Sequence, residues 1–379
     1  MCPTQAYLDN SATTRVCPEA IDCMLDCVKN NWGNPSSLHE RGMCAEDLLE
    51  RARKSVAGVL KSEMSEIVFT SGGTQSNNIA VFGAAEALKR KGNKIITSSV
   101  EHPSVMKAVD RLEKEGCEVV RLSVDKYGRV DLDELQRELD EKTVLVSVMA
   151  VNNELGTIEP IKEISTLIKK SGCPALFHVD AVQAFGKIPL SVRVLGVDLM
   201  SVSSHKIHGP KGAGALYVKK GVRLVSPVVG GGQEKDIRPG TEPMPAIAGF
   251  YGAVGALETE KSLEKITALR NKTVEKLRKL DGVVLNSPED ALPYIINLSL
   301  PGLPSEAVLN LLSNMNIYVS SGSACAKGHK SPVLTAAGLP NDLINSSLRI
   351  SFSRFTEEKE TEMLLDGIKQ ALSTLRRKK

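Results

Sequence analysis

Val144-Leu-Val-Ser-Val-Met-Ala150 and Leu176-Phe-His-Val179 are two short apolar runs on either side of an amphipathic stretch over residues 161–171. Short runs rich in β-branched residues predict buried strands, and the period of the stretch between them predicts a helix. A strand, a helix and a second strand in this order form a βαβ unit, which builds a parallel sheet. This segment therefore predicts an α/β fold.

The same alternation continues on both sides of this unit, from about residue 50 to residue 250. Further strands are expected at 67–70, 94–97, 118–122 and 199–202, and further helices after residue 70 and over 104–115 and 131–140. We expect the run Ala213–Val218 to close the series as a hairpin-like edge. These elements predict a large domain over residues 15–255 with a mainly parallel sheet between helices.

The pattern changes after Gly249. A long charged helix is expected over 255–280, an antiparallel strand over 294–300, a helix over 305–315, a strand near Tyr318 and a final helix over 357–376. This order predicts a smaller α+β domain made of residues 1–14 and 256–379.

Composition narrows the range of partners. The 48 Lys and Arg residues nearly balance the 45 Asp and Glu residues, so the net charge of +3 argues against a surface devoted to nucleic acids or membranes. No apolar run approaches the length that crosses a bilayer. Residues 1–14 lack the basic and apolar stretches of a secretory signal. We therefore expect a cytoplasmic protein with no membrane partner and no direct nucleic-acid partner.

The eight cysteines are expected to be reduced thiols. Cys17, Cys23 and Cys27 lie close together, and the last two would share one face of a helix. Their spacing is not that of a zinc knuckle, and no histidine lies near them in the sequence. We interpret them as core residues and expect no metal site.

Polar residues that follow the expected strands are the candidates for a ligand site, because ligands of parallel sheets bind at the carboxyl ends of strands. Thr70-Ser-Gly-Gly-Thr-Gln-Ser-Asn-Asn78 contains Gly73, which allows a tight turn, and Thr74, which opens a helix. The free N–H groups of that helix end could hold a phosphate. The alternative is an ordinary strand-to-helix turn with a threonine cap.

Two further strand ends carry His102 and Asn153. Both lie where they could face a ligand, although loop hydrogen bonds are the commoner role for such residues. Asp180 ends a fully apolar strand, and Gln183 follows one turn later. A buried carboxylate needs a positive partner or strong hydrogen bonds.

The segment Ser201-Val-Ser-Ser-His-Lys-Ile-His-Gly209 ends another apolar strand and carries Lys206. A lysine at this depth must be paired or used chemically. Pyridoxal 5′-phosphate would satisfy these groups together: Lys206 takes its aldehyde as a Schiff base, Asp180 faces its ring nitrogen, and the helix at Thr74 meets its phosphate. The expected supporting contacts are from Gln183 to the phenolic oxygen, from Ser203 and His205 to the phosphate, and from His102 to the ring face.

The second domain contributes two more candidates. Cys325 lies in Val319-Ser-Ser-Gly-Ser-Ala-Cys-Ala-Lys-Gly328, among small residues and near Lys327, His329 and Lys330. These cations favour the thiolate, so Cys325 is a candidate nucleophile. Arg349 is expected on a strand, where it could hold a carboxylate in two-pronged fashion. The alternative for Arg349 is a surface ion pair.

Taken together, these segments resemble the cysteine desulfurases of the NifS/IscS type, within the class-V aminotransferase family of pyridoxal phosphate enzymes. The resemblance covers nearly the whole chain. It also includes Tyr7–Thr14, Gly33-Asn-Pro-Ser-Ser-Leu-His39, Gly230-Gly-Gly-Gln-Glu234 and Arg238-Pro-Gly-Thr-Glu242. It implies fold type I with a seven-stranded-type sheet, and a homodimer in which Thr241 of one subunit reaches the phosphate held by the other.

The resemblance also implies the chemistry. Asn34, Asn153 and Arg349 would face an L-cysteine substrate, Lys206 or His102 would move its α-proton, and Cys325 would attack its sulfur. Alanine leaves and a persulfide remains on Cys325, from which the sulfur passes to an acceptor protein.

One departure concerns that acceptor. After Cys325 the chain runs Ala-Lys-Gly-His-Lys-Ser-Pro332, which is shorter and more basic than the loop of members that serve the iron–sulfur scaffold. The sulfur carried on Cys325 has two possible destinations. One is iron–sulfur cluster assembly, with any transfer made through Cys325, and the other is tRNA or thiamin sulfur relay. A selenocysteine lyase, a class-V aminotransferase and a sulfur carrier without turnover are the competing functions.

Overall fold

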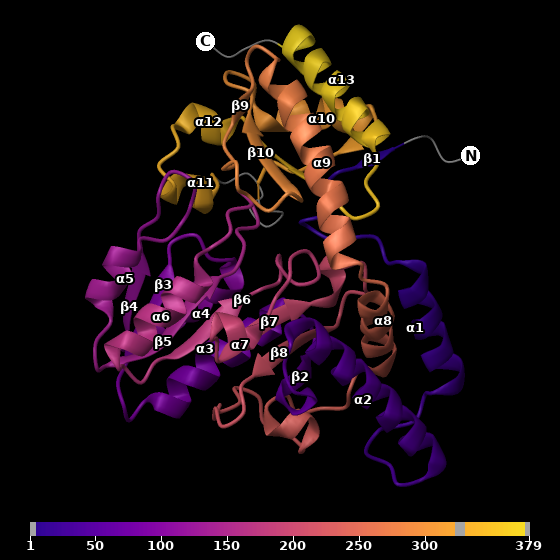
Figure 1. Ribbon diagram of the computed structural model, residues 1–379, viewed down its shortest axis with the longest axis vertical. Helices are drawn as coiled ribbons and strands as arrows, with labels where there is room; N and C mark the ends of the chain where they lie inside the picture. The colour runs from indigo at the N-terminus through magenta and orange to yellow at the C-terminus, as the bar shows by residue number, and fades with distance from the viewer. Residues whose placement is uncertain (1–4, 323–329, 376–379) are drawn as a thin grey trace.

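A seven-stranded sheet forms the larger part of the protein, whose computed structural model describes residues 5–322 and 330–375. Figure 1 shows this part below and a smaller part above it. In spatial order the strands are β2 (Ile67–Thr70), β8 (Gly214–Val218), β7 (Leu199–Ser203), β6 (Leu176–Asp180), β5 (Thr143–Met149), β3 (Lys94–Ser98) and β4 (Glu118–Leu122). Strands β3 to β7 pair in parallel, as the alternating sequence pattern predicts.

The expected position of the run Ala213–Val218 at a sheet edge is wrong. It forms β8, which lies between β2 and β7 and pairs antiparallel with both. All five residues of β8 are buried, because strands cover both of its sides and helices cover both of its faces. The edge on this side is β2, the first strand of the sheet in the chain.

Helices cover both faces of the sheet. Neighbouring residues within a strand point to opposite faces, so that Ile95 packs in the core under α3 and α4, and Ile96 packs in the core on the other side. The helices of this part are α1 (Pro18–Asn30), α2 (Glu40–Leu60), α3 (Gly73–Leu88), α4 (Pro103–Lys114), α5 (Leu132–Glu138), α6 (Ile161–Ser171), α7 (Val192–Leu195) and α8 (Met244–Gly255). Cys17 and Cys27 lie in the core of this part.

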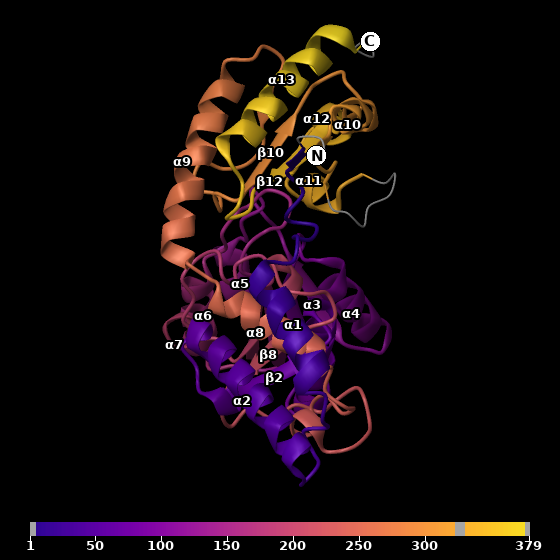
Figure 2. The same ribbon diagram turned by 90° about the vertical axis from the view of Figure 1, so that its right-hand side faces the viewer.

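The smaller part is an α+β unit. Its antiparallel sheet has the order β12 (Ser347–Ser351), β10 (Ile295–Ser299) and β9 (Val284–Leu285), and a two-stranded sheet joins β1 (Ala6–Tyr7) to β11 (Ile317–Tyr318). Its helices are α9 (Thr259–Arg278), α10 (Ser305–Asn314), α11 (Pro332–Ala336), α12 (Asn341–Asn345) and α13 (Glu358–Thr374). Figure 2 shows α9 and α13 side by side above the larger part.

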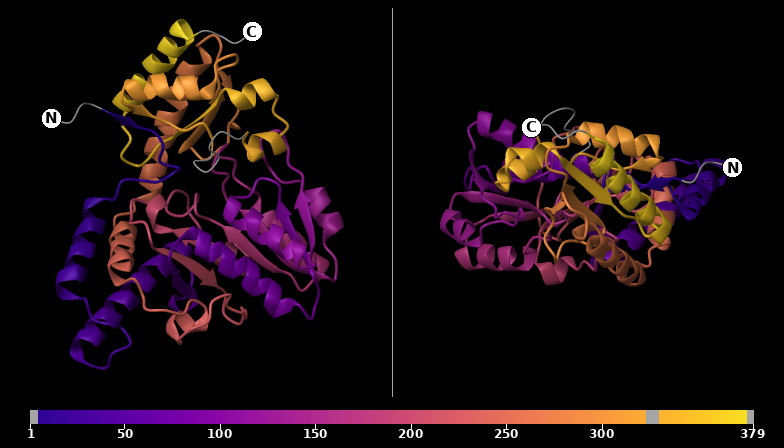
Figure 3. Two further views of the ribbon diagram at one scale, coloured as in Figure 1. Left: turned by 180° about the vertical axis from the view of Figure 1, so that it is seen from behind. Right: turned by 90° about the horizontal axis from the view of Figure 1, so that it is seen from above.

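The first described residues connect the two parts. β1 lies in the smaller part, and the chain then descends to α1 in the larger part, as the view from behind shows (Figure 3). On the way, Asp9 bridges Ser351 of β12, and the N–H of Thr14 donates to the carbonyl of His205 at 3.0 Å. Residues 9–14, the N-terminal strap, therefore lie between the ends of the large sheet and β12. No helix of the described chain is long and apolar enough to span a membrane.

Candidate active site

A cavity of about 620 Å³ lies at the carboxyl ends of the central strands, under the N-terminal strap. Ten of the residues expected at the site line it: Gly73, Thr74, His102, Asn153, Asp180, Gln183, Ser203, His205, Lys206 and Arg349. Nine of them come from the large sheet and its loops, and Arg349 comes from β12 of the smaller part. The cavity therefore lies where the two parts meet.

One end of the cavity is suited to an anion. The N-terminus of α3 opens onto it, with Gly73 and Thr74 in the first turn. A Cβ atom on Gly73 would come within 2.6 Å of Val182 Cγ2, so the close approach of this turn requires glycine. The Ser203 hydroxyl lies beside the turn, is buried and has no hydrogen-bond partner among the described residues. An anion at this end would supply the missing acceptor.

Asp180 also lines the cavity, as the last residue of β6, and is 6% exposed. Its carboxylate accepts hydrogen bonds from Asn77 Nδ2 at 2.7 Å and from the backbone N–H of Val182 at 2.9 Å. A buried carboxylate that faces a cavity is suited to hold a cationic group of a ligand.

A hydrogen-bond chain joins Asp180 to His102. Asn77 Nδ2 also donates to Ser104 Oγ at 2.8 Å, and this hydroxyl lies 2.7 Å from His102 Nδ1. The backbone N–H of Ser104 donates to the same nitrogen at 3.1 Å. Nδ1 is therefore an acceptor, and the neutral ring carries its proton on Nε2.

The same surroundings keep His102 uncharged. Burial lowers the pKa of His102, Asp180 acts in the opposite direction, and Lys206 lowers it further. Burial likewise lowers the pKa of His205 to about 4, with Lys206 adding to the effect. Both histidines that line the cavity are therefore uncharged at neutral pH.

Lys206 follows β7 directly and reaches the N-terminal strap. Its Nζ donates to the backbone carbonyls of Ser11 and Ala12, the latter at 2.9 Å. Gln183 Nε2 donates to the Ser11 carbonyl as well, at 3.0 Å. The strap thus holds both side chains at the edge of the cavity.

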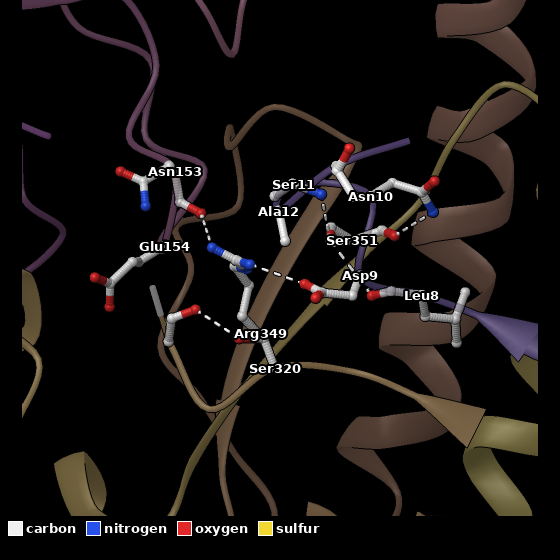
Figure 4. Close-up of polar contacts among 12 residues, drawn as sticks. Leu8, Asp9, Asn10, Ser11, Ala12, Asn153, Glu154, Ser320, Arg349 and Ser351 are labelled. Atoms are coloured by element: carbon white, nitrogen blue, oxygen red, sulfur yellow. Dashed lines mark hydrogen bonds and ion pairs between the residues drawn. The ribbon is translucent and has the colours of Figure 1, made fainter. Parts of the chain in front are cut away.

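Arg349 closes the side of the cavity toward the smaller part (Figure 4). It is 1% exposed, so the alternative of a surface ion pair is wrong. Its Nη2 donates to Asp9 Oδ1 at 2.9 Å, and its Nη1 donates to the carbonyl of Asn153 at 3.1 Å. Its Nε is buried and has no partner among the described residues. The guanidinium therefore keeps donors for a further acceptor.

Three expected site residues do not take part in this arrangement. Asn34 and Thr241 are exposed and do not line the cavity. Cys325 lies outside the described residues, which resume at Lys330. The roles expected of these three residues stay predictions.

Sequence reasoning assigned no role to Asn77, Ser104 or Asp9. Asn77 and Ser104 lie in segments that were singled out, one turn into α3 and at the start of α4. Because Asn77 and Ser104 lie a few residues after strand ends, their positions could have marked them as candidate site residues. Asp9 lies in Tyr7–Thr14, a segment of the family resemblance, but its partner Arg349 lies 340 residues away, so local spacing could not pair the two residues.

Pyridoxal phosphate fits the groups that surround the cavity. Its phosphate would meet the orphaned Ser203 hydroxyl and the helix end at Gly73, and its ring nitrogen would meet the Asp180 carboxylate. Lys206, which lines the same cavity, would supply the amine that takes the aldehyde. The donor set thus offers a partner to each polar end of the cofactor.

The sequence of this chain is similar to those of known proteins over nearly its whole length. The aminotransferase class-V family matches residues 6–364. The protein named cysteine desulfurase IscS of Methanosarcina thermophila is 42% identical over 375 residues, which cover 98% of this chain and 92% of that protein. The NifS/IcsS protein homolog of Lactobacillus delbrueckii subsp. bulgaricus is 44% identical over 364 residues, which cover 94% of each chain.

Solved structures give the same result. A structure described as a NifS-like protein aligns with a TM-score of 0.93 at 38% identity and covers 98% of this chain and 100% of that chain. A structure described as SspA in complex with cysteine aligns with a TM-score of 0.83 at 32% identity, covering 93% and 100%. They confirm the predicted fold type I. The chain therefore belongs to the aminotransferase class-V family, among the cysteine desulfurases of the NifS/IscS type.

Proposed function

We propose that this protein is a pyridoxal phosphate-dependent cysteine desulfurase, which takes the sulfur of L-cysteine and releases L-alanine. The observation that carries the proposal is one cavity that combines Lys206, the Asp180 carboxylate, the helix end at Gly73 and the Arg349 guanidinium. Relatives of nearly the same length bear the name cysteine desulfurase, and a structural neighbour was solved with cysteine.

The cofactor, when bound, supplies an aldehyde for the amine of an amino acid and a ring that accepts the electrons released at the α-carbon. The protein supplies the surroundings. The ring nitrogen would face the Asp180 carboxylate, which Asn77 Nδ2 and the backbone N–H of Val182 hold in place by hydrogen bonds. Gly73, Thr74, Ser203 and His205, which line the cavity, would hold the phosphate.

The protonation state of His102 assigns the proton transfers. Because its Nδ1 accepts two hydrogen bonds, its Nε2 bears a proton and is a donor rather than a base. Lys206, which lines the cavity, is then the group that removes the α-proton of the substrate once its amine is free. His102 would cover the ring face of the bound cofactor, with Nε2 as its donor.

The substrate carboxylate binds to Arg349. The buried guanidinium has donors left over after its bonds to Asp9 and Asn153. A carboxylate held there by two parallel hydrogen bonds fixes the orientation of the amino acid. Asn153 lines the same side of the cavity.

Cys325 completes the reaction. Its thiolate attacks the substrate sulfur, a sulfur–sulfur bond forms, and the substrate carbon–sulfur bond breaks with its electron pair left on carbon. That carbon takes a proton and becomes the methyl group of alanine, while the persulfide stays on Cys325 for transfer to an acceptor protein.

The remaining assignments concern the setting of the enzyme. We assign it a homodimer in which Thr241 reaches the phosphate of the partner subunit, and a place in the cytoplasm. The near-even charge balance supports protein acceptors over direct contact with nucleic acid. An iron–sulfur scaffold and a tRNA or thiamin sulfur carrier are the two acceptor classes. Transfer of ³⁵S from the loaded enzyme to a purified scaffold protein, compared with a tRNA-thiolating enzyme, decides between them.

Alanine and sulfide formation from L-cysteine tests the proposed activity. Equal amounts of both products are expected from the purified protein with a reducing thiol, and neither from Lys206→Ala or Cys325→Ala. Loss of sulfide but survival of amino transfer in Cys325→Ala would instead indicate an aminotransferase. Turnover of selenocysteine alone would indicate a selenocysteine lyase, and sulfur binding without turnover would indicate a carrier.

A further inference from the structure

Lys187 is a buried lysine that the chemistry above does not use. It follows Gln183 by four residues and is 6% exposed. Its Nζ donates to Gln183 Oε1 at 2.9 Å and lies 5.8 Å from the centroid of the Tyr294 ring. No carboxylate within the described ranges 5–322 and 330–375 forms an ion pair with it. Among the described residues, its hydrogen-bond partner is Gln183.

This contact fixes one end of the Gln183 amide, and the N-terminal strap fixes the other. Gln183 Nε2 donates to the Ser11 carbonyl at 3.0 Å. If the amide were reversed, its NH₂ group would face the Lys187 amine and its oxygen would face the Ser11 carbonyl. A donor would then face a donor and an acceptor would face an acceptor, so the amide has one stable orientation.

The orientation has a consequence for the cavity. Gln183 lines the cavity with its oxygen already committed to Lys187 and one N–H committed to Ser11. The second N–H of its amide is left for the cavity. Gln183 is thereby a hydrogen-bond donor to whatever anionic oxygen lies there.

Retaining a lysine at this position carries a cost. Burial, together with the nearby Lys206 and Arg349, lowers the pKa of Lys187 to about 7. A methionine would fill the same space without that cost, but it would leave the Gln183 oxygen unpaired and the amide free to turn. The fixed orientation of the Gln183 amide compensates for the cost of burying the lysine.

We propose that Lys187 is a positioning residue, which keeps the Gln183 amide turned so that an N–H faces the ring oxygen of the cofactor. The inference rests on the proposed function, because it takes pyridoxal phosphate as the ligand. Lys187 acts through Gln183 and does not itself touch the cofactor.

The visible absorbance of the cofactor, titrated with pH in the resting holoenzyme, tests the proposal. Loss of a donor to the ring oxygen makes that oxygen hold the neighbouring proton more tightly, so the midpoint of the absorbance change should rise. A rise of about 0.5 to 1 pH unit is expected for Lys187→Met, as for the loss of one hydrogen bond. Gln183→Ala should give the same rise, and the double variant should give no further rise.

Lys94→Met is the matched control. Lys94 is 5% exposed but binds Glu138 and Asp140 far from the cavity, so its loss should lower stability and leave the midpoint unchanged. Gln183→Glu is the second variant, because its carboxylate can pair with Lys187, which keeps the fold, while it offers no N–H. It should raise the midpoint with Lys187 intact, so it tests the donor even if Lys187→Met does not fold.

Additive shifts in the double variant, or no shift in Lys187→Met and Gln183→Glu, would overturn the role of Lys187. A wild-type protein that shows no cofactor absorbance at any pH would overturn the proposed function instead. The two failures are therefore distinguishable.

Discussion

Replacement of Arg349 should remove the preference of the enzyme for substrates that carry a carboxylate. Arg349 is 1% exposed and keeps free donors beside the cavity. Hydrogen bonds between charged groups contribute about 1.5 to 3 kcal/mol each to an interaction of this kind. A loss of about 3 kcal/mol in Arg349→Met corresponds to roughly a 100-fold fall in kcat/KM for L-cysteine.

Arg349→Lys separates charge from geometry. The lysine keeps the positive charge but loses the planar pair of donors, so a smaller loss of about 10-fold is expected. The assay compares L-cysteine with cysteamine, which has the same amine and thiol but no carboxylate. Cysteamine turnover should be nearly the same in wild type and both variants, so the ratio of the two kcat/KM values should fall toward one.

Arg270→Met is the matched control for this experiment. Arg270 is also buried, at 7% exposure, but it binds the backbone carbonyls of Pro288 and Glu289 outside the cavity. Its loss should lower stability without changing the substrate ratio. An equal fall for cysteine and cysteamine in Arg349→Met would refute the assigned carboxylate site, since a general loss of packing would lower both.

Two further predictions concern Ser203 and Glu159. Ser203→Ala removes a buried hydroxyl that has no hydrogen-bond partner among the described residues, so the free energy of unfolding of the cofactor-free protein, measured in urea, should rise by about 1 kcal/mol. Pyridoxal phosphate should bind this variant roughly 5- to 10-fold more weakly. Unchanged cofactor affinity would contradict the assignment of Ser203 to the phosphate site. Burial raises the pKa of Glu159 to about 8 from 4.5, so the folded protein holds a proton that the unfolded chain releases, and stability should fall by up to about 1.4 kcal/mol per pH unit as pH rises from 4.5 to 8. Glu159→Gln should flatten this slope in urea titrations at pH 5.5 and 7.5, and an unchanged slope would show that other groups cause it.

Local sequence patterns predicted the site residues that lie at, or just after, the carboxyl end of a single strand. Asp180 is the last residue of one buried strand and Lys206 follows another, and parallel strands bring their carboxyl ends to one edge of a sheet. Their meeting in one cavity could therefore be predicted from the alternation of apolar and amphipathic segments. Helices α1, α2 and α8 were not predicted, because no strand pattern frames them.

Features that depend on distant pairing could not be read from local patterns. The position of β8 between β2 and β7 is set by which strands meet in space, and its apolar run is equally compatible with an edge. The Arg349 and Asp9 contact joins β12 to the N-terminal strap, which the two-part fold brings together. The orientation of the Gln183 amide depends on Lys187 and Ser11 at once, and only the folded chain supplies both partners.

Mapping the lysine that binds the cofactor covalently tests directly whether Lys206 holds pyridoxal phosphate. The yellow holoenzyme is reduced with borohydride, digested with a protease and mapped by mass spectrometry. One modified peptide is expected, with the phosphopyridoxyl group on Lys206. A colourless protein that takes up no added pyridoxal phosphate, or a label on another lysine with Lys206 unmodified, would contradict it.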